Sequence, residues 1–343
     1  MSSPADRPVL LFYRDYERDK FFPNDRYIRR YLRPVYNRFR RTKSISGFHV
    51  WYLRLVQALR ESGYQVEENN FGLARRYPDY PVGLVGYPSI LRQWDLPNPA
   101  ILGPGLFDHP AQRPDLMNDK RYRYYIVTCD WVRDMFQRSY GACCVPWYAG
   151  IDTREWPDAT SCEKTIDLLV YDKIRWNREA YERDFIMPLL RTVESSGRSY
   201  SVLRYGEYQY PRFRELLRAS RAMIFLCEHE TQGMAYQEAM ACNVPILAWD
   251  NGYWLDPRRP RFDPNPVPAS SVPYFSAECG ERFRDIGEFP AVFDRFWTNV
   301  TTSDGPVYRP RQYVERELSL AGSARLYMQY YDALLRDREP AAP

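Results

Sequence analysis

Two glutamates, Glu230 and Glu238, are the residues whose type and spacing in this chain most clearly suggest chemistry. The segment between them contains Thr231, Gln232 and Gly233. A carboxylate is a pure hydrogen-bond acceptor, so it can bind both hydroxyls of a ribose or sugar diol. A glycine lets the backbone approach a phosphate, and the free N–H groups of a following helix favour an anion. This combination predicts a nucleotide-sugar site, although a single glutamate in an early helical turn is more often only a partner of the helix dipole.

Short apolar runs flank this segment and predict the elements that position it. Residues 222–226 and residues 244–248 each have the length and composition of a fully buried strand. The unit is therefore strand, loop, helix, strand, with Glu230 in the loop and Glu238 about a turn and a half into the helix. In open α/β sheets the ligand lies outside the carboxyl ends of the strands, so we expect the loop of residues 227–233 at a binding site.

The run Glu238-Ala-Met-Ala-Cys-Asn-Val-Pro245 completes a recognisable pattern. Together with Glu230 it resembles the E-x7-E signature of the family 4 retaining glycosyltransferases. Asn243 stands where that signature has a glycine, but asparagine is the next best residue at a left-handed helix end. The resemblance implies transfer of a sugar from a nucleotide-sugar donor with retention of the anomeric configuration. It places Glu230 on the donor sugar and Glu238 on the ribose.

Other segments extend the resemblance over most of the chain. Residues 46–66 are similar to the glycine loop, helix and second strand of the family's first domain, and residues 126–157 are similar to the passage between its domains. The implied fold is α/β and of the GT-B type, with two Rossmann-like domains facing a central cleft. The predicted parts are an acceptor domain at 1–150, a donor domain at 151–312, a helical segment at 313–338 that crosses back to the first domain, and a tail at 339–343.

A positively charged group is needed beside the leaving diphosphate, and the loop after the predicted strand 165–171 supplies candidates. This loop contains Lys173, Arg175 and Arg178. The family uses an arginine and a lysine from this region, but the loop lacks the family's Gly-Arg and Lys-Gly pairs. We predict that Lys173 and Arg175 serve here. The loop of residues 204–208, which contains Tyr205, is expected beside the base.

The three histidines of the chain have different expected roles. His109 follows the predicted strand 100–102, in a loop of residues 103–110 that is expected to face the cleft, and the resemblance places a histidine near there on the donor sugar or acceptor. His49 lies by Gly47, whose loop amides are predicted to face the diphosphate, and the imidazole either binds there or only caps or packs. His229 is flanked by acids and is expected to support the site or to be exposed.

No metal or cofactor is expected beyond the nucleotide sugar, which is a substrate. The chain has no D-x-D triplet, which argues against a metal-dependent GT-A enzyme, and its histidines are too widely spread for a zinc cluster. Its seven cysteines include no C-x-x-C pair, and the adjacent Cys143 and Cys144 are expected to pack in the core. We expect reduced thiols.

A basic aromatic segment at residues 26–43, from Arg26 to Lys43, contains no acid. It suits an anionic membrane surface that carries a lipid-linked acceptor, or it is a solvated helix face that pairs with acids elsewhere. Nothing else predicts a nucleic-acid module. The chain of 343 residues has a net charge of +4, no apolar run long enough to cross a bilayer and no signal-peptide pattern, so we expect a cytoplasmic protein. The proline-rich residues 256–268 predict a surface loop without a helix or central strand.

Two other functions remain open from the sequence. One is a GT-B transferase with another substrate, such as a CMP-linked acid sugar; a phosphorylase is disfavoured because no motif for a lysine-bound cofactor is present. The other is a catalytically silent binding or scaffold protein that keeps the fold. The glutamates and Gly233 argue against the silent protein, and the altered cation loop argues for it.

Overall fold

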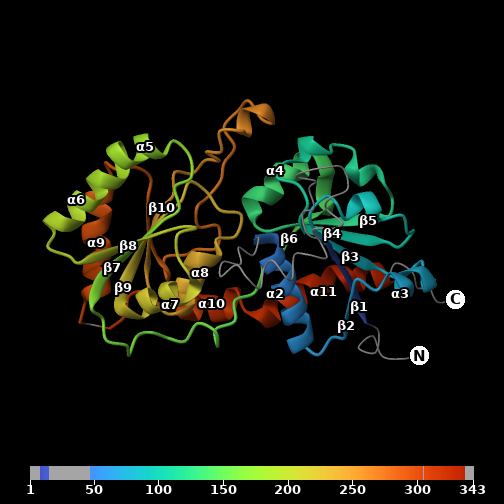
Figure 1. The fold of residues 1–343 in the computed structure, drawn as a ribbon, viewed down its shortest axis with the longest axis horizontal. Coiled ribbons are helices and arrows are strands. Elements are labelled where there is room, and N and C mark those ends of the chain that lie inside the picture. Colours follow the sequence, from blue (N-terminus) through green and yellow to red (C-terminus); the bar gives the residue numbers. More distant parts are fainter. Residues whose placement is uncertain (1–7, 15–46, 304, 337–343) are drawn as a thin grey trace, which may run out of the picture. The chain divides into compact units, whose positions relative to one another are not determined.

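The computed structural model describes residues 8–14, 47–303 and 305–336. Contacts within the chain divide it into two units. The first unit comprises residues 1–127, 136–147 and 323–343, and the second comprises residues 128–135 and 148–322. Each unit is built on a parallel sheet (Figure 1).

The first unit contains a six-stranded sheet in the order β2-β1-β3-β4-β5-β6, and all its neighbouring strands are parallel. The strands are β1 (Val9–Arg14), β2 (Val66–Glu68), β3 (Val82–Gly86), β4 (Ala100–Gly105), β5 (Tyr122–Val127) and β6 (Cys144–Pro146). The α-helices that lie wholly or partly in this unit are α2 (Gly47–Glu61), α3 (Phe71–Arg76), α4 (Asp130–Tyr140) and α11 (Leu320–Arg336). Short 3-10 turns occur at Leu91–Gln93, Pro110–Gln112, Leu116–Asn118 and Gly141–Cys143.

The second unit contains a five-stranded parallel sheet in the order β11-β10-β9-β7-β8. The strands are β7 (Ile166–Asp172), β8 (Tyr200–Arg204), β9 (Ser220–Leu226), β10 (Ile246–Trp249) and β11 (Gly280–Phe283). The helices are α5 (Arg178–Tyr181), a π-helical turn (Glu182–Ile186), α6 (Met187–Ser195), α7 (Tyr210–Ala219), α8 (Met234–Ala241), α9 (Phe289–Thr301) and α10 (Pro310–Glu317). The chain reverses its direction of winding between β7 and β9, which is the topological switch point of this sheet.

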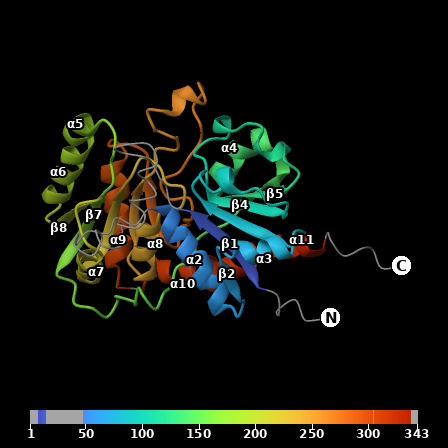
Figure 2. The same cartoon turned by 45° about the vertical axis from the view of Figure 1, so that its right-hand side comes forward.

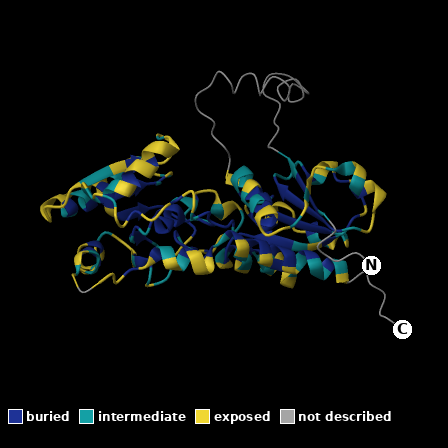
Figure 3. Cartoon of the chain, turned by 90° about the horizontal axis from the view of Figure 1, so that it is seen from below, coloured by how far each residue is buried: buried dark blue, intermediate teal, exposed yellow. Residues whose placement is uncertain are grey.

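The central strands of this second sheet are buried on both faces, as expected for a parallel sheet covered by helices. Along β9, Met223 and Phe225 pack with α7 and α8, whereas Ile224 and Leu226 pack with α6 and α9. This alternation follows the two-residue period of a strand. Figure 2 shows the helices on either side of the strands, and Figure 3 shows buried strands beneath helices with exposed outer faces. The carboxyl ends of β7 and β9 are thereby fixed in place.

The elements predicted around the two glutamates are present in the structure. The runs at 222–226 and 244–248 correspond to β9 and β10, and the helix between them is α8. Asn243 has a φ of 61° and follows α8, so it occupies the left-handed position predicted for it. Its N–H donates to the Met240 carbonyl at 2.9 Å, which ends the helix.

Several bounds differ from the sequence predictions. Strand β4 continues to Gly105, so the first residues of the predicted loop 103–110 belong to the strand. Within the described residues, Gly47 is the first residue of α2 and does not lie in a loop. The proline-rich loop contains one 3-10 turn at Arg259–Arg261, because a proline is tolerated at the start of a helical turn.

The two units also have bounds that differ from those of the predicted domains. The longer segment of the second unit begins at residue 148. The segment predicted at 313–338 is divided between the two units, because residues up to 322 belong to the second unit and residues from 323 onward belong to the first. The basic residues 26–43 and the tail 339–343 lie outside the described residues. No helix in the described part of the chain is both long and apolar enough to cross a membrane. All seven cysteines are free thiols.

Candidate functional site

Two loops leave the second sheet side by side at its switch point. Asp172, the last residue of β7, pairs in register with Leu226, the last residue of β9. The next N–H, that of Lys173, donates to the Leu226 carbonyl at 2.8 Å. The loop after β7 and the loop after β9 therefore begin together at the place where ligands bind in open α/β sheets.

An ion pair between Lys173 and Glu230 joins these loops. The Lys173 ammonium contacts the Oε1 atom of Glu230, and the two side chains are only 15% and 11% exposed. Burial acts to lower the pKa of Lys173, but the attraction and hydrogen bond of Glu230, together with Cys227 and Tyr205, raise that pKa above its usual value. The ring of Tyr205 lies 4.7 Å from the ammonium nitrogen, which suits a cation–π contact. Three predicted site residues thus meet here.

The backbone of Glu230 is held from two sides. Its N–H donates to the Ser270 carbonyl at 2.9 Å. Its carbonyl accepts a hydrogen bond from the indole N–H of Trp131, also at 2.9 Å. The carboxylate of Glu230 therefore extends from a fixed backbone.

Glu238 lies inside α8 and is buried. Tyr171 and Tyr208 share a hydroxyl–hydroxyl hydrogen bond of 2.7 Å, and the pKa of each is raised by burial first and also by the charge of Glu238. Burial is the largest cause of the raised pKa of Tyr171, and the charges of both glutamates raise it further. Both glutamates therefore influence Tyr171, and the sugar and ribose roles predicted for them stay predictions.

Gly233 and Gln232 shape the turn that leads into α8. Gly233 has a φ of 83°, and a Cβ atom there would lie 2.1 Å from the ring of Tyr236. Gln232 is buried, and its side-chain amide pairs with both backbone groups of Ala149, at 3.0 Å from the N–H and 2.7 Å from the carbonyl. Thr231, which precedes both, is half-buried. The donor-binding roles of these three loop residues stay predictions.

The other two cations of the β7 loop already have carboxylate partners. The Nε atom of Arg175 lies 3.5 Å from Glu228, and its guanidinium packs 4.2 Å from the ring centre of Trp176. Arg178 forms ion pairs with Asp172 and Glu182. Of the three, only Lys173 pairs with a glutamate of the E-x7-E pattern.

His229 contributes a buried aromatic contact that the sequence did not predict. Its ring stacks on Trp176, with centres 5.4 Å apart, and makes edge contacts with Trp131 and Trp254. The alternative of an exposed histidine was therefore wrong, because three tryptophans distant in sequence enclose it. Burial, reinforced by the positive charge of Arg175, lowers the pKa of His229 to about 3, so its imidazole is neutral.

His109 and Gly47 lie in the first unit. The His109 side chain accepts a hydrogen bond from the Ala111 N–H at 3.1 Å and so caps the 3-10 turn that follows. The roles predicted for these two residues at the donor or acceptor stay predictions. Among the described residues, no cluster of three or more histidine, cysteine or acidic side chains could hold a metal ion.

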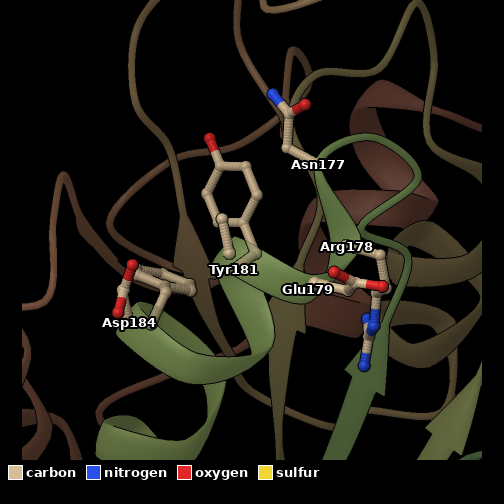
Figure 4. Close-up of a pocket in the computed structure, with 7 residues that line it drawn as sticks. Asn177, Arg178, Glu179, Tyr181 and Asp184 are labelled. Atoms are coloured by element: carbon tan, nitrogen blue, oxygen red, sulfur yellow. The ribbon is translucent and has the colours of Figure 1, made fainter.

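An open hollow of about 680 Å³ lies beside the start of α5. Its lining residues all come from the segment 177–185, namely residues 177–181, Asp184 and Phe185 (Figure 4). None of the predicted donor-binding residues lines it. We therefore place the candidate site on the chemistry at Lys173 and Glu230 and not on this hollow.

Comparison with known proteins identifies the fold. No protein-family model and no curated protein matches the chain. Sucrose-phosphate synthase from Thermosynechococcus elongatus superimposes with a TM-score of 0.58 at 13% identity, covering 96% of this chain and 100% of that chain. TarM of S. aureus, in a mutant complex with fondaparinux, α-GlcNAc-glycerol and UDP, gives a TM-score of 0.52 at 12% identity.

The TarM alignment covers 74% of this chain and 55% of TarM, so the chain spans little more than half of that protein's length. Both structures are glycosyltransferases of the GT-B type. At these identities the likeness establishes the fold. This chain has the GT-B fold of two parallel-sheet α/β domains, and the fold class predicted from its sequence is confirmed.

Proposed function

We propose that this protein is a retaining, metal-independent glycosyltransferase of family 4 type. It would move a sugar, of the hexosyl class, from a nucleotide-sugar donor to a hydroxyl of a glycan or lipid-linked acceptor. The observation that carries the proposal is the Lys173–Glu230 pair at the switch point of the second sheet, with Glu238 near by. The complex of TarM with UDP and a sugar-bearing ligand supports a nucleotide-linked donor.

The residues at this site have complementary charges for the proposed reaction. The ammonium of Lys173 would bind the diphosphate and stabilise the negative charge that develops as the bond from the anomeric carbon to the phosphate oxygen breaks. Glu230 would bind the hydroxyls of the transferred sugar, and Glu238 would bind the ribose diol. The acceptor oxygen then forms the new bond on the same face, and its proton passes to the departing phosphate.

The Lys173–Glu230 pair also suggests how the site is kept intact before a donor arrives. Each buried charge satisfies the other, so neither is left without a partner. A donor brings both a diphosphate for Lys173 and hydroxyls for Glu230. The ion pair is then replaced by two sets of charge-assisted hydrogen bonds, which are the strong ones.

A silent binding protein is the second candidate, and one observation favours it. Lys173, Arg175 and Arg178 all have carboxylate partners, so the cation loop contains no guanidinium or ammonium group that lacks a counter-charge. A silent protein would bind a nucleotide or a glycan without turnover. Release of nucleoside diphosphate from the donor distinguishes the two candidates.

The test is an incubation with UDP-, GDP-, ADP-, dTDP- and CMP-sugars, in which release of the nucleotide is followed with and without glycan acceptors. We expect one donor to be turned over and Glu230→Gln to lower that rate roughly 100-fold. Glu215→Gln is the matched control, because Glu215 is an exposed glutamate of α7 that pairs with Arg212 at 2.8 Å. An unchanged rate in Glu230→Gln would remove Glu230 from the mechanism, and NMR of the early product tests retention through the anomeric configuration.

A further inference from the structure

A buried carboxylate next to the candidate site binds the backbone of the opposite loop. Glu228 is 2% exposed. Its Oε1 atom accepts two hydrogen bonds from consecutive backbone N–H groups, at 2.7 Å from Arg175 and at 3.0 Å from Trp176. Its Oε2 atom lies 3.5 Å from the Arg175 guanidinium, which offsets the buried charge. All of these contacts are made to the loop after β7.

The residues on either side of this carboxylate extend the same contact between the two loops. Next along the chain, the His229 ring stacks on Trp176 at an interplanar angle of 15°. After it, Glu230 pairs with Lys173. Three consecutive residues of one loop therefore each bind the other loop, and the outer two do so through carboxylates with different partners.

The two carboxylates have distinct tasks. Glu230 contacts a side-chain ammonium that can exchange its partner for a ligand. Glu228 contacts backbone N–H groups that have no such freedom, and a buried N–H left without an acceptor is unfavourable. Satisfying both groups with one oxygen fixes the path of the loop immediately after Lys173.

We propose that Glu228 is a positioning residue: it holds the segment from Lys173 to Trp176 so that the Lys173 ammonium is presented beside Glu230, where the donor diphosphate would bind. The consequence of this role for the reaction rests on the proposed function, whereas the contact between Glu228 and the loop does not. Glu228 touches neither the donor nor the reacting atoms. It acts through Lys173.

The first experiment needs no ligand. Amide hydrogen exchange is measured by mass spectrometry across residues 172–177 in the wild type, Glu228→Gln and Glu228→Ala. Glutamine keeps one side-chain oxygen, which is the acceptor that both N–H groups use, so exchange in Glu228→Gln should stay close to that of the wild type. Alanine removes the acceptor, and exchange at Arg175 and Trp176 should rise roughly tenfold or more. Unchanged protection in the alanine variant, or equal loss in both variants, overturns the proposal.

The second experiment separates positioning of Lys173 from a general loss of structure. UDP, ADP and GDP are titrated against the three proteins, together with uridine, adenosine and guanosine, which lack the diphosphate. For the diphosphate that binds the wild type, Glu228→Ala should weaken affinity roughly tenfold, while the affinity for the matching nucleoside stays unchanged. Glu228→Gln should restore the diphosphate affinity. An equal fall for nucleoside and diphosphate overturns the positioning role.

Asp167→Ala is the matched control, because Asp167 is also a carboxylate that accepts a backbone N–H, that of Ser199 at 2.9 Å, but at the amino end of the same sheet. This variant should leave exchange at residues 172–177 and the diphosphate affinity unchanged, and a change in either would overturn the specificity claimed for Glu228. If the wild type binds none of the three diphosphates, the proposed function fails, and the exchange experiment still decides whether Glu228 holds the loop.

Discussion

Replacing Lys173 with methionine tests whether the pair with Glu230 is a buried and coupled interaction. The change removes the ammonium and keeps much of the side chain's length and volume. It leaves the Glu230 carboxylate, which is 11% exposed, without its counter-charge. Breaking a buried ion pair in this way costs about 3–5 kcal/mol, and the residual exposure of both groups places the expected loss near the lower end, at about 3 kcal/mol.

The size of the second unit converts this loss into a temperature shift. A domain of 150–250 residues loses roughly 2–4 °C for each kcal/mol, so the unfolding transition of this unit should fall by roughly 6–12 °C. The free energy of unfolding is measured by urea titration with tryptophan fluorescence, and the transition temperature by calorimetry. Lys120→Met is the control, since Lys120 is an exposed lysine and its loss should change stability by less than about 0.5 kcal/mol.

A double variant makes the prediction sharper. Lys173→Met combined with Glu230→Gln removes both charges, so no buried charge lacks a partner, and much of the lost stability should return. A loss below about 1 kcal/mol, or strictly additive effects in the double variant, would refute the claim that the pair is buried and coupled.

Three further changes test the loop around this pair. His229→Phe should remove a pH dependence of stability. Burial lowers the pKa of His229 to about 3, so below pH 6.5 the unfolded chain takes up a proton that the folded chain does not. Between pH 7 and 5 the wild type should therefore lose about 2 kcal/mol more stability than the variant in urea titrations, and equal losses would contradict this. Gly233→Ala should destabilise the protein more than Gly63→Ala, by about 1 kcal/mol or more. Both glycines have positive φ, but of these two only Gly233 has a neighbour that an added Cβ atom would meet. Equal unfolding free energies of the two variants would disprove this explanation. Gln232→Leu should cost roughly 2–3 kcal/mol in the same titration, because both backbone groups of Ala149 lose their partner, and a neutral substitution would show that water replaces the amide.

The parts of the fold that were predictable from the sequence depend on local signals. The apolar runs that became β9 and β10, and the left-handed residue Asn243 between them, follow from chain periodicity and from the conformations that single residues favour. The position of Glu230 in a loop at the carboxyl end of β9 follows from the same signals. These features require no knowledge of which segments meet in space.

The parts that were not predictable depend on contacts between distant segments. Glu228 meets Arg175 and Trp176 more than fifty positions away in the sequence, and nothing in the spacing of these residues indicates the pairing. The same holds for Gln232 and Ala149, which are 83 positions apart. The first contact depends on the register of β7 against β9, and the second on the packing of the segment after β6 against the loop after β9. A single sequence reveals neither.

The choice among the cations of the β7 loop illustrates this limit. Lys173, Arg175 and Arg178 are equivalent as sequence features, since each follows the same strand. The structure separates them by their partners, because Arg178 pairs with the carboxylate that ends its own strand and Lys173 pairs with Glu230. The distinction is electrostatic and tertiary in origin.

The most direct test of the proposed function is a binding titration of the purified wild type and of Glu238→Ala against UDP-, GDP-, ADP-, dTDP- and CMP-sugars, measured by calorimetry. We expect one clear binder in this panel and a loss of its affinity in the variant, because the carboxylate of Glu238 would bind the ribose diol. Absence of any binder, or equal affinity in the two proteins, would contradict it.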